Sequence, residues 1–261
     1  MSAIPAQQHV SGPAVAMLRR WDEQQAAYIS RREQRFDIML DVVEATVPAD
    51  GLVLDLACGP GSISARVAHR FPRMRLVGVD YDPALIALAR AWAGEEGLDG
   101  RVRFTDADLL DRTWTSALQG NVPHAVLTST ALHWLPGAGL VRLYDELAGL
   151  LEPESVFLNA DHLRAPTGRP LFTRLSRRDD ELTQARARAA GADSWDGWFA
   201  SLGEDPDYSA ALQVREQRFA DRPRNPDLSL AFHVEALRVA GFAEAGPVWQ
   251  HFDDYVVLAR R

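Results

Sequence analysis

The sequence predicts an α/β fold, a doubly wound and mostly parallel sheet with helices on both faces. Short apolar runs, typical of buried strands, alternate with amphipathic stretches of ten or more residues, the order that parallel strands require. The first apolar run leads into the loop Gly59-Pro60-Gly61, which is typical of a ligand-binding turn. With 261 residues, 47% of them hydrophobic and 25% charged, the chain can bury a core and has an ordinary globular composition.

The predicted elements follow one another at short intervals. Five strands are expected in "GLVLDLA", "RLVGVD", "RVRF", "HAVLTS" and "SVFLNA". The helices between them are "SISARVAHRF", "PALIALARAWA" and "GLVRLYDELAGLL". Asp82 before Pro83 marks a helix start, because aspartate caps free amides and proline fits the first turn. A helix in "SLAFHVEALRVAGF" and a hairpin of "PVWQHF" with "YVVLAR" close the fold.

Two further segments complete the predicted organisation. Apolar residues at helical spacing from Arg19 to Ala45 predict one long N-terminal helix, with Tyr28, Arg32 and Arg35 on one face. After Asp161 the alternation stops, and several helical stretches predict a cap over the strand ends, where open α/β sheets bind ligands. The expected division is an N-terminal helical segment, an α/β core, a helical cap insertion and a core completion, at residues 1–48, 49–162, 163–228 and 229–261.

Composition excludes several classes of protein. A net charge of -8 disfavours nucleic-acid binding, which needs a basic face. No apolar run approaches the roughly 20 residues of a membrane helix, and the N-terminus lacks a basic signal region, so we expect a cytoplasmic protein. Cys58 is the single cysteine, which excludes an internal disulfide and a thiolate-rich zinc site. The histidines show no metal-ligand spacing, and we predict no metal.

The glycine loop could accept a dinucleotide or a ligand that carries a positive charge. A dinucleotide fingerprint has a third glycine three residues after the second, where this chain has Ser64. Asp55, in the first strand, would repel a pyrophosphate and attract an ammonium group. Asp80, 21 residues after Gly59, suits the ribose hydroxyls of either ligand. These residues favour the positively charged ligand.

Four stretches resemble, in order and spacing, the motifs of class I S-adenosylmethionine-dependent methyltransferases. They are "VLDLACGPGS", "LVGVDYDPALIALAR", "VRFTDADL" and "HAVLTSTALHWL", within residues 50–160. The chain looks similar to small-molecule, natural-product tailoring members, and it departs from the family at "LEPES", where Pro-Gly-Gly is common. The resemblance implies a Rossmann-like sheet of seven strands with the last antiparallel, and S-adenosyl-L-methionine as the cofactor.

The resemblance also implies roles toward the cofactor. Asp55 would face its ammonium group and Asp80 its ribose. Tyr81 would lie beside the adenine and Asp108 at its amino group, with Ala107 and Leu109 flanking it. Arg32 would pair with the methionine carboxylate. The full set expected to bind the cofactor is Asp55, Ala57, Gly59, Gly61, Asp80, Tyr81, Asp108, Leu109, Thr128 and Arg32.

The acceptor side is predicted from residues near the strand ends. His133 is the expected base or proton relay, since a phenol, an amine or an indole must lose a proton on methylation. By the resemblance, Tyr28 would touch both the methyl donor and the acceptor. Each has a structural alternative, a histidine bonded to backbone and a tyrosine in the core. The residues expected to bind the substrate are Trp134, His162, Trp195 and Trp198, and Asp161 is a further candidate.

The sequence therefore predicts an enzyme, a methyltransferase acting on a small aromatic acceptor in secondary metabolism, at a phenol oxygen or an indole-type carbon or nitrogen. A carboxyl O-methyltransferase of the trans-aconitate type is the alternative within the class, because "TSTALHWL" resembles those enzymes too. A dinucleotide-dependent oxidoreductase is the alternative from another class, disfavoured by Ser64 and Asp55. The expected partner is a small molecule, neither nucleic acid nor membrane, and a homodimer stays open.

Overall fold

The computed structural model describes residues 12–163, 169–220 and 228–261. Its centre is one seven-stranded sheet in the order β3-β2-β1-β4-β5-β7-β6, in which only β7 runs antiparallel to its neighbours. This confirms the predicted doubly wound sheet with an antiparallel last strand. The strands are β1 (Leu52–Leu56), β2 (Arg75–Asp80), β3 (Val102–Asp106), β4 (Ala125–Ser129), β5 (Val156–His162), β6 (Glu244–His251) and β7 (Asp254–Arg260).

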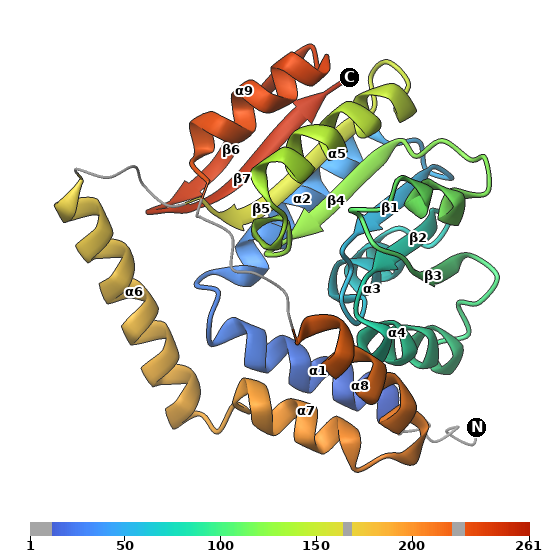
Figure 1. Ribbon diagram of the computed structural model, residues 1–261, viewed down its shortest axis with the longest axis vertical. Helices are drawn as coiled ribbons and strands as arrows, with labels where there is room; N and C mark the ends of the chain where they lie inside the picture. The colour runs from blue at the N-terminus through green and yellow to red at the C-terminus, as the bar shows by residue number, and fades with distance from the viewer. Residues whose placement is uncertain (1–11, 164–168, 221–227) are drawn as a thin grey trace, which may run out of the picture.

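Helices cover both faces of the sheet, because its central strands are apolar on both sides. In β1, Val53 enters one hydrophobic core while Leu54 enters the other, as the alternation of side chains along a strand requires. The first core is closed by α3 (Ser62–Arg70), α4 (Pro83–Glu95) and the N-terminal helices. The second is closed by α5 (Gly137–Leu150), α9 (Leu230–Ala240) and the 3-10 helix η1 (Arg112–Leu118), and Figure 1 shows α5 and α9 in front of the sheet.

The N-terminal segment differs from its prediction. Two helices, α1 (Pro13–Ala26) and α2 (Arg32–Thr46), replace the single long helix, and Arg31 between them has a left-handed backbone with φ 55°. The first helix packs against α4, whereas the second packs against β5 and β7. The chain must turn to reach both, so tertiary packing overrides the continuous helical periodicity. As a result Tyr28 lies in the turn and does not share a helix face with Arg32 and Arg35.

Between β5 and α9, the described residues form three helices, namely α6 (Pro170–Ala189), α7 (Trp195–Gly203) and α8 (Pro206–Phe219). α7 packs against α1, and α8 packs against α4. Figure 1 shows α1, α7 and α8 below the sheet, on the side toward which the parallel strands point. Although α6 has 20 residues, no helix in the described part of the chain is long and apolar enough to cross a membrane.

Candidate active site

A cavity of about 700 Å³ opens at the carboxyl ends of the parallel strands. Its walls come from the α1–α2 turn, the glycine loop, the segments after β2, β3 and β4, the end of β5 and two cap helices. The fold therefore brings together most residues that the sequence singled out, although they are far apart in the chain. Those that line it are Tyr28, Arg32, Asp55, Ala57, Gly59, Asp80, Tyr81, Asp108, Leu109, His133, Trp134, His162 and Trp195.

The glycine loop is held in a conformation that ordinary residues adopt rarely. Ala57, Gly59 and Gly61 all have positive φ, at 55°, 55° and 94°. The Cys58 amide donates to the Val79 carbonyl at 2.9 Å, which ties the loop to β2. A left-handed alanine costs free energy, of order 1 kcal/mol or more, so the strain at Ala57 is held by the surrounding structure, as is common at ligand sites.

Asp55 is fully buried and braces the start of α3. Its Oδ2 accepts bonds from the Ser64 amide at 3.0 Å and the Ser64 hydroxyl at 2.7 Å. Its Oδ1 has no hydrogen-bond partner among the described residues, and the residue borders the cavity. Burial raises the pKa of the Asp55 carboxyl to about 7. Ser64 occupies the position at which a dinucleotide fingerprint has glycine, and here its amide and hydroxyl hold the Asp55 carboxylate.

Asp80 joins the end of β2 to the glycine loop. Its Oδ2 accepts from the Gly59 amide and its Oδ1 from the Asp82 amide, each at 2.7 Å. Each carboxylate oxygen can accept more than one bond, so Asp80 can hold the loop and still bind ligand hydroxyls at the cavity wall. The predicted ribose role of Asp80 is compatible with this position at the cavity wall and stays a prediction.

His133 and Asp161 form a hydrogen-bonded pair at the cavity. His133 lies on the 3-10 helix η2 (Leu132–Trp134), and its Nδ1 is 2.9 Å from Oδ1 of Asp161, at the end of β5. Asp161 is fully buried; burial alone would raise its pKa, but the His133 imidazole beside it holds the pKa below its usual value. The carboxylate fixes Nδ1, which makes Nε2 the ring atom that can exchange a proton with an acceptor.

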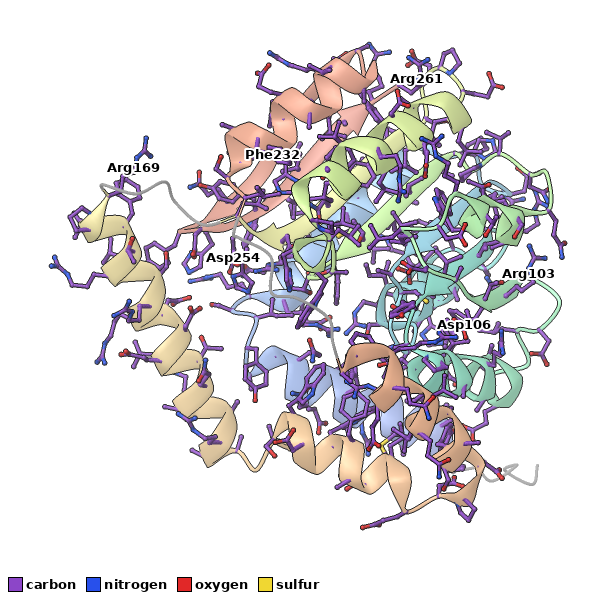
Figure 2. All side chains as sticks on the ribbon, viewed as in Figure 1. Arg103, Asp106, Arg169, Phe232, Asp254 and Arg261 are labelled. Atoms are coloured by element: carbon purple, nitrogen blue, oxygen red, sulfur yellow. The ribbon has the colours of Figure 1, made fainter. Side chains whose placement is uncertain are left out.

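A second histidine at the cavity also meets a buried carboxylate. Nδ1 of His162 lies 2.5 Å from Oδ1 of Asp254, an ion-pair contact without hydrogen-bond geometry. Asp254, labelled in Figure 2, begins β7 opposite His162 and also pairs with the buried Arg35 of α2. Ligand atoms of His162, Asp253 and Asp254 lie within 4.8 Å of one another, but Arg35 already neutralises Asp254. The absence of a metal stays a prediction.

The sequence reasoning missed two arginines of α8 that reach back to the cofactor side. Arg215 lines the cavity, donates to the Asp82 carboxylate at 2.6 Å and lies over the Phe199 ring. Arg218 donates to the Tyr81 carbonyl at 2.7 Å and pairs with Asp106, which Figure 2 labels at the end of β3. In the sequence, the only signal from Arg215 and Arg218 is their spacing of three residues, which places them on one helix face. This spacing does not show which residues they contact. These contacts hold the cap against the α/β core.

Three residues predicted for the site do not line the cavity. The predicted contact of Trp198 with an acceptor was wrong, whereas the backbone roles of Gly61 and Thr128 toward the cofactor stay predictions. Trp198 is buried in the core, where its ring meets Trp21 edge-to-face with the ring centroids 4.7 Å apart, so it stabilises the cap rather than meeting an acceptor. Gly61 precedes α3 as its N-cap and lies beside the Phe104 ring, which an added Cβ would meet at 3.1 Å. Thr128 is fully buried in β4, and its neighbour Ser129 lines the cavity instead.

Comparison with known proteins agrees with this geometry. Residues 53–154 match a family model described as a methyltransferase domain. The trans-aconitate 2-methyltransferase of Streptomyces avermitilis is 35% identical over 126 residues, which are 47% of this chain and 44% of the relative. That of Methylobacterium radiotolerans is 36% identical over 129 residues, 48% of this chain and 45% of the relative. The chain thus spans less than half the length of these relatives.

Solved structures share the fold over nearly the whole chain. An O-methyltransferase family protein from Burkholderia thailandensis superposes with a TM-score of 0.54 at 18% identity, covering 95% of this chain and 71% of that one. Magnesium protoporphyrin IX methyltransferase from Synechocystis, solved with bound SAH, has a TM-score of 0.56 at 16% identity and 94% coverage of both chains. Residues 53–154 are thus similar to a methyltransferase domain, and the described chain shares the fold of solved methyltransferases.

Proposed function

We propose that the protein transfers a methyl group from S-adenosyl-L-methionine to a small aromatic acceptor, at a phenol oxygen or an indole-type carbon or nitrogen. The observation that carries this proposal is the His133–Asp161 pair at the wall of the cavity that also contains the glycine loop and Asp80. Methyl transfer from a sulfonium is an in-line displacement, in which the protein mainly positions the two reactants. A base is needed when the acceptor arrives protonated, and the contact of His133 with the buried Asp161 supports His133 as that base.

The charges around the cavity favour a neutral acceptor over a polycarboxylate. Four aspartates line it, Asp55, Asp80, Asp82 and Asp108. Arg32 and Arg215 are the arginines that line it within the described residues, and each is already paired with an aspartate. Arg32 is 2.8 Å from Asp22, which does not line the cavity, and Arg215 is 2.6 Å from Asp82, which does. A multiply charged acid would meet acidic groups and arginines that are already neutralised. Carboxyl O-methylation stays the second candidate, because the curated relatives are named trans-aconitate 2-methyltransferases.

The raised pKa of Asp55 predicts how cofactor affinity depends on pH. The pKa of this carboxyl is about 7 without ligand, and the cofactor's ammonium group binds the ionised form. Affinity for S-adenosylhomocysteine should therefore fall as pH drops below about 7, by up to tenfold per pH unit, and level off above it. The free protein has the opposite trend: it loses stability as pH rises toward 7, since the unfolded chain releases this proton earlier. Calorimetric titrations between about pH 5 and about pH 8 measure the affinity.

Asp55→Asn is the matched variant for this measurement. It keeps the shape of the side chain and removes the titrating group, so its affinity should be lower at neutral pH and nearly independent of pH in this range. The same steep pH dependence in Asp55→Asn would show that another group is responsible.

The function itself is tested by mass spectrometry with a labelled methyl donor against phenols, indoles and carboxylic acids. We expect label in at least one hydroxyaromatic or indole compound, and binding of S-adenosylhomocysteine but not NADH in calorimetry. Label in carboxylic acids alone would replace the proposed acceptor class by the second candidate. Binding of NADH without S-adenosylhomocysteine would refute methyl transfer altogether.

A further inference from the structure

A second cavity, of about 420 Å³, lies at the amino ends of β1, β2 and β3, whereas the candidate active site lies at the carboxyl ends. The first residues of these strands, Leu52, Arg75 and Val102, line it. Among the described residues, none lines both cavities. β3 is the edge strand at the right of the sheet in Figure 1, so the cavity borders an open sheet edge. Such an edge presents main-chain N–H groups and can form an anion-binding concavity.

This cavity is lined by four arginines and one acidic residue. The arginines are Arg75, Arg90, Arg101 and Arg103, and the acid is Asp99. The chain as a whole has a net charge of -8, so the charge around this cavity is opposite in sign to that of the protein. In the part of the chain that the structure describes, none of the four arginines forms an ion pair with a carboxylate. Their positive charge is therefore available to a ligand.

Three of the guanidinium groups are held by neutral oxygens. Arg90, on α4, donates through Nε to the Phe104 carbonyl of β3 at 3.0 Å. Arg103, the residue before Phe104, donates to the Ala117 carbonyl of η1 at 2.8 Å. Arg101 also donates to main-chain carbonyls. A carbonyl orients a guanidinium group without cancelling its charge, so these side chains are fixed in place and remain cationic.

The strand register brings the arginines close together. Arg103 of β3 pairs with Val77 of β2, and Arg75 lies two residues before Val77, so both arginines are on the same face of the sheet. The Leu76 amide donates to the Arg101 carbonyl at 2.8 Å, which places Arg101 beside the start of β2. Figure 2 labels Arg103 at this edge of the molecule. The four positive charges thus surround one short stretch of the edge strand.

We propose that this cavity binds a small molecule with a diphosphate or triphosphate group. Arg90 uses only Nε for its protein contact, so its two terminal nitrogens can bind two oxygens of one phosphate. Because α4 and η1 cover opposite faces of the sheet, a linear polyphosphate across the edge of β3 can meet both Arg90 and Arg103. The volume of about 420 Å³ lies in the range of small-molecule sites. The inference goes beyond methyl transfer and does not depend on it.

Arginines on an edge strand can have another purpose, because charged side chains prevent an open edge from pairing with a second sheet. That purpose requires charge at the edge. It does not require a cavity, or guanidinium groups fixed by carbonyls on both faces of the sheet. The two explanations differ in one measurable property, since only the binding site gives specific affinity for a polyphosphate.

The test is isothermal titration calorimetry with inorganic tripolyphosphate and with ATP, at about 0.15 M salt so that weak surface attraction is screened. The wild type should bind tripolyphosphate. Arg90→Gln and Arg103→Gln should each weaken this binding about tenfold or more, the effect of losing one charge-assisted hydrogen bond. Glutamine keeps a donor for the carbonyl and removes the charge. The titrations are repeated with S-adenosylhomocysteine present, so that ATP does not occupy the candidate active site.

Arg238→Gln is the matched control. Arg238 is an exposed arginine of α9 that pairs with Glu235 and does not line the cavity. The substitution changes the net charge by the same amount, and affinity for tripolyphosphate should stay within about twofold of the wild type. Thermal unfolding checks that each variant is folded.

Each outcome decides the inference. Tighter binding of ATP would identify a nucleotide as the source of the phosphates, and tighter binding of tripolyphosphate an inorganic polyphosphate; both support the site. No saturable binding of either compound, or undiminished binding in both Arg90→Gln and Arg103→Gln, would overturn it. Self-association of Arg103→Gln without anion binding by the wild type would assign the arginines to edge protection. Affinity for S-adenosylhomocysteine is measured separately, so failure here leaves the proposed methyl transfer intact.

Discussion

His133→Ala is expected to lower the turnover of a phenolic acceptor by roughly 10²- to 10⁴-fold, the range that a positioned general base contributes. Affinity for S-adenosylhomocysteine should change little, because His133 lies on η2 while the glycine loop and Asp80 hold the cofactor side. The loss falls on kcat more than on KM, since the proton moves in the transition state.

The physical reason is the buried carboxylate behind the imidazole. Asp161 is fully buried, so its charge acts on the nearby His133 in surroundings that screen it weakly. It keeps the ring in one orientation and stabilises the imidazolium that forms as the acceptor is deprotonated. A histidine bonded only to backbone would lack this support.

The pH profile distinguishes a base from a merely structural histidine. At a pH above the acceptor's own pKa the phenol is already ionised, so the deficit of His133→Ala should shrink as pH rises. A structural defect would give a deficit that does not depend on pH. His69→Gln serves as the control histidine and should retain wild-type turnover. Undiminished turnover in His133→Ala at neutral pH would remove His133 as the base.

Asp80→Ala is expected to weaken binding of S-adenosylhomocysteine by at least about a hundredfold, since each hydrogen bond to a charged acceptor contributes roughly 1.5–3 kcal/mol. The substitution removes the acceptors for the ribose hydroxyls and also the bond to the Gly59 amide. Asp80→Asn keeps one oxygen acceptor and should lose less. Isothermal titration calorimetry measures the affinities, and thermal unfolding checks that each variant is folded.

Asp111→Ala is the matched control for this experiment. Asp111 also accepts a bond from the amide two residues on, Thr113 at 2.9 Å, as Asp80 does from Asp82, but it does not line the cavity. Its loss should leave cofactor affinity within about twofold, because surface substitutions have small effects. Wild-type affinity in a folded Asp80→Ala protein would refute the assignment of this strand end to the ribose.

Local patterns were sufficient to predict most of the α/β core. The apolar runs and the Asp82-Pro83 helix start correspond to β1 to β5 and α4, because parallel strands are buried on both faces and a capped helix start is a local feature. The N-terminal helix was predicted wrongly as one piece, since nothing at Ala27–Arg31 breaks the helical pattern. Trp198 was misassigned for a related reason. The sequence does not distinguish an aromatic residue that packs on Trp21 from one that faces a ligand.

The sequence alone was enough to bring the glycine loop, Asp55 and Asp80 to one edge of the sheet, because the parallel strand order places the carboxyl ends of the strands together. Only the tertiary structure decided the acceptor side. His133 and Asp161 are 28 positions apart in the sequence and meet because β4 lies beside β5. His162 and Asp254 are 92 positions apart and meet because β5 lies beside β7. Such contacts cannot be predicted from the spacing of residues in the sequence. They depend on which strands become neighbours in the sheet and on which carboxylates are buried beside the histidines.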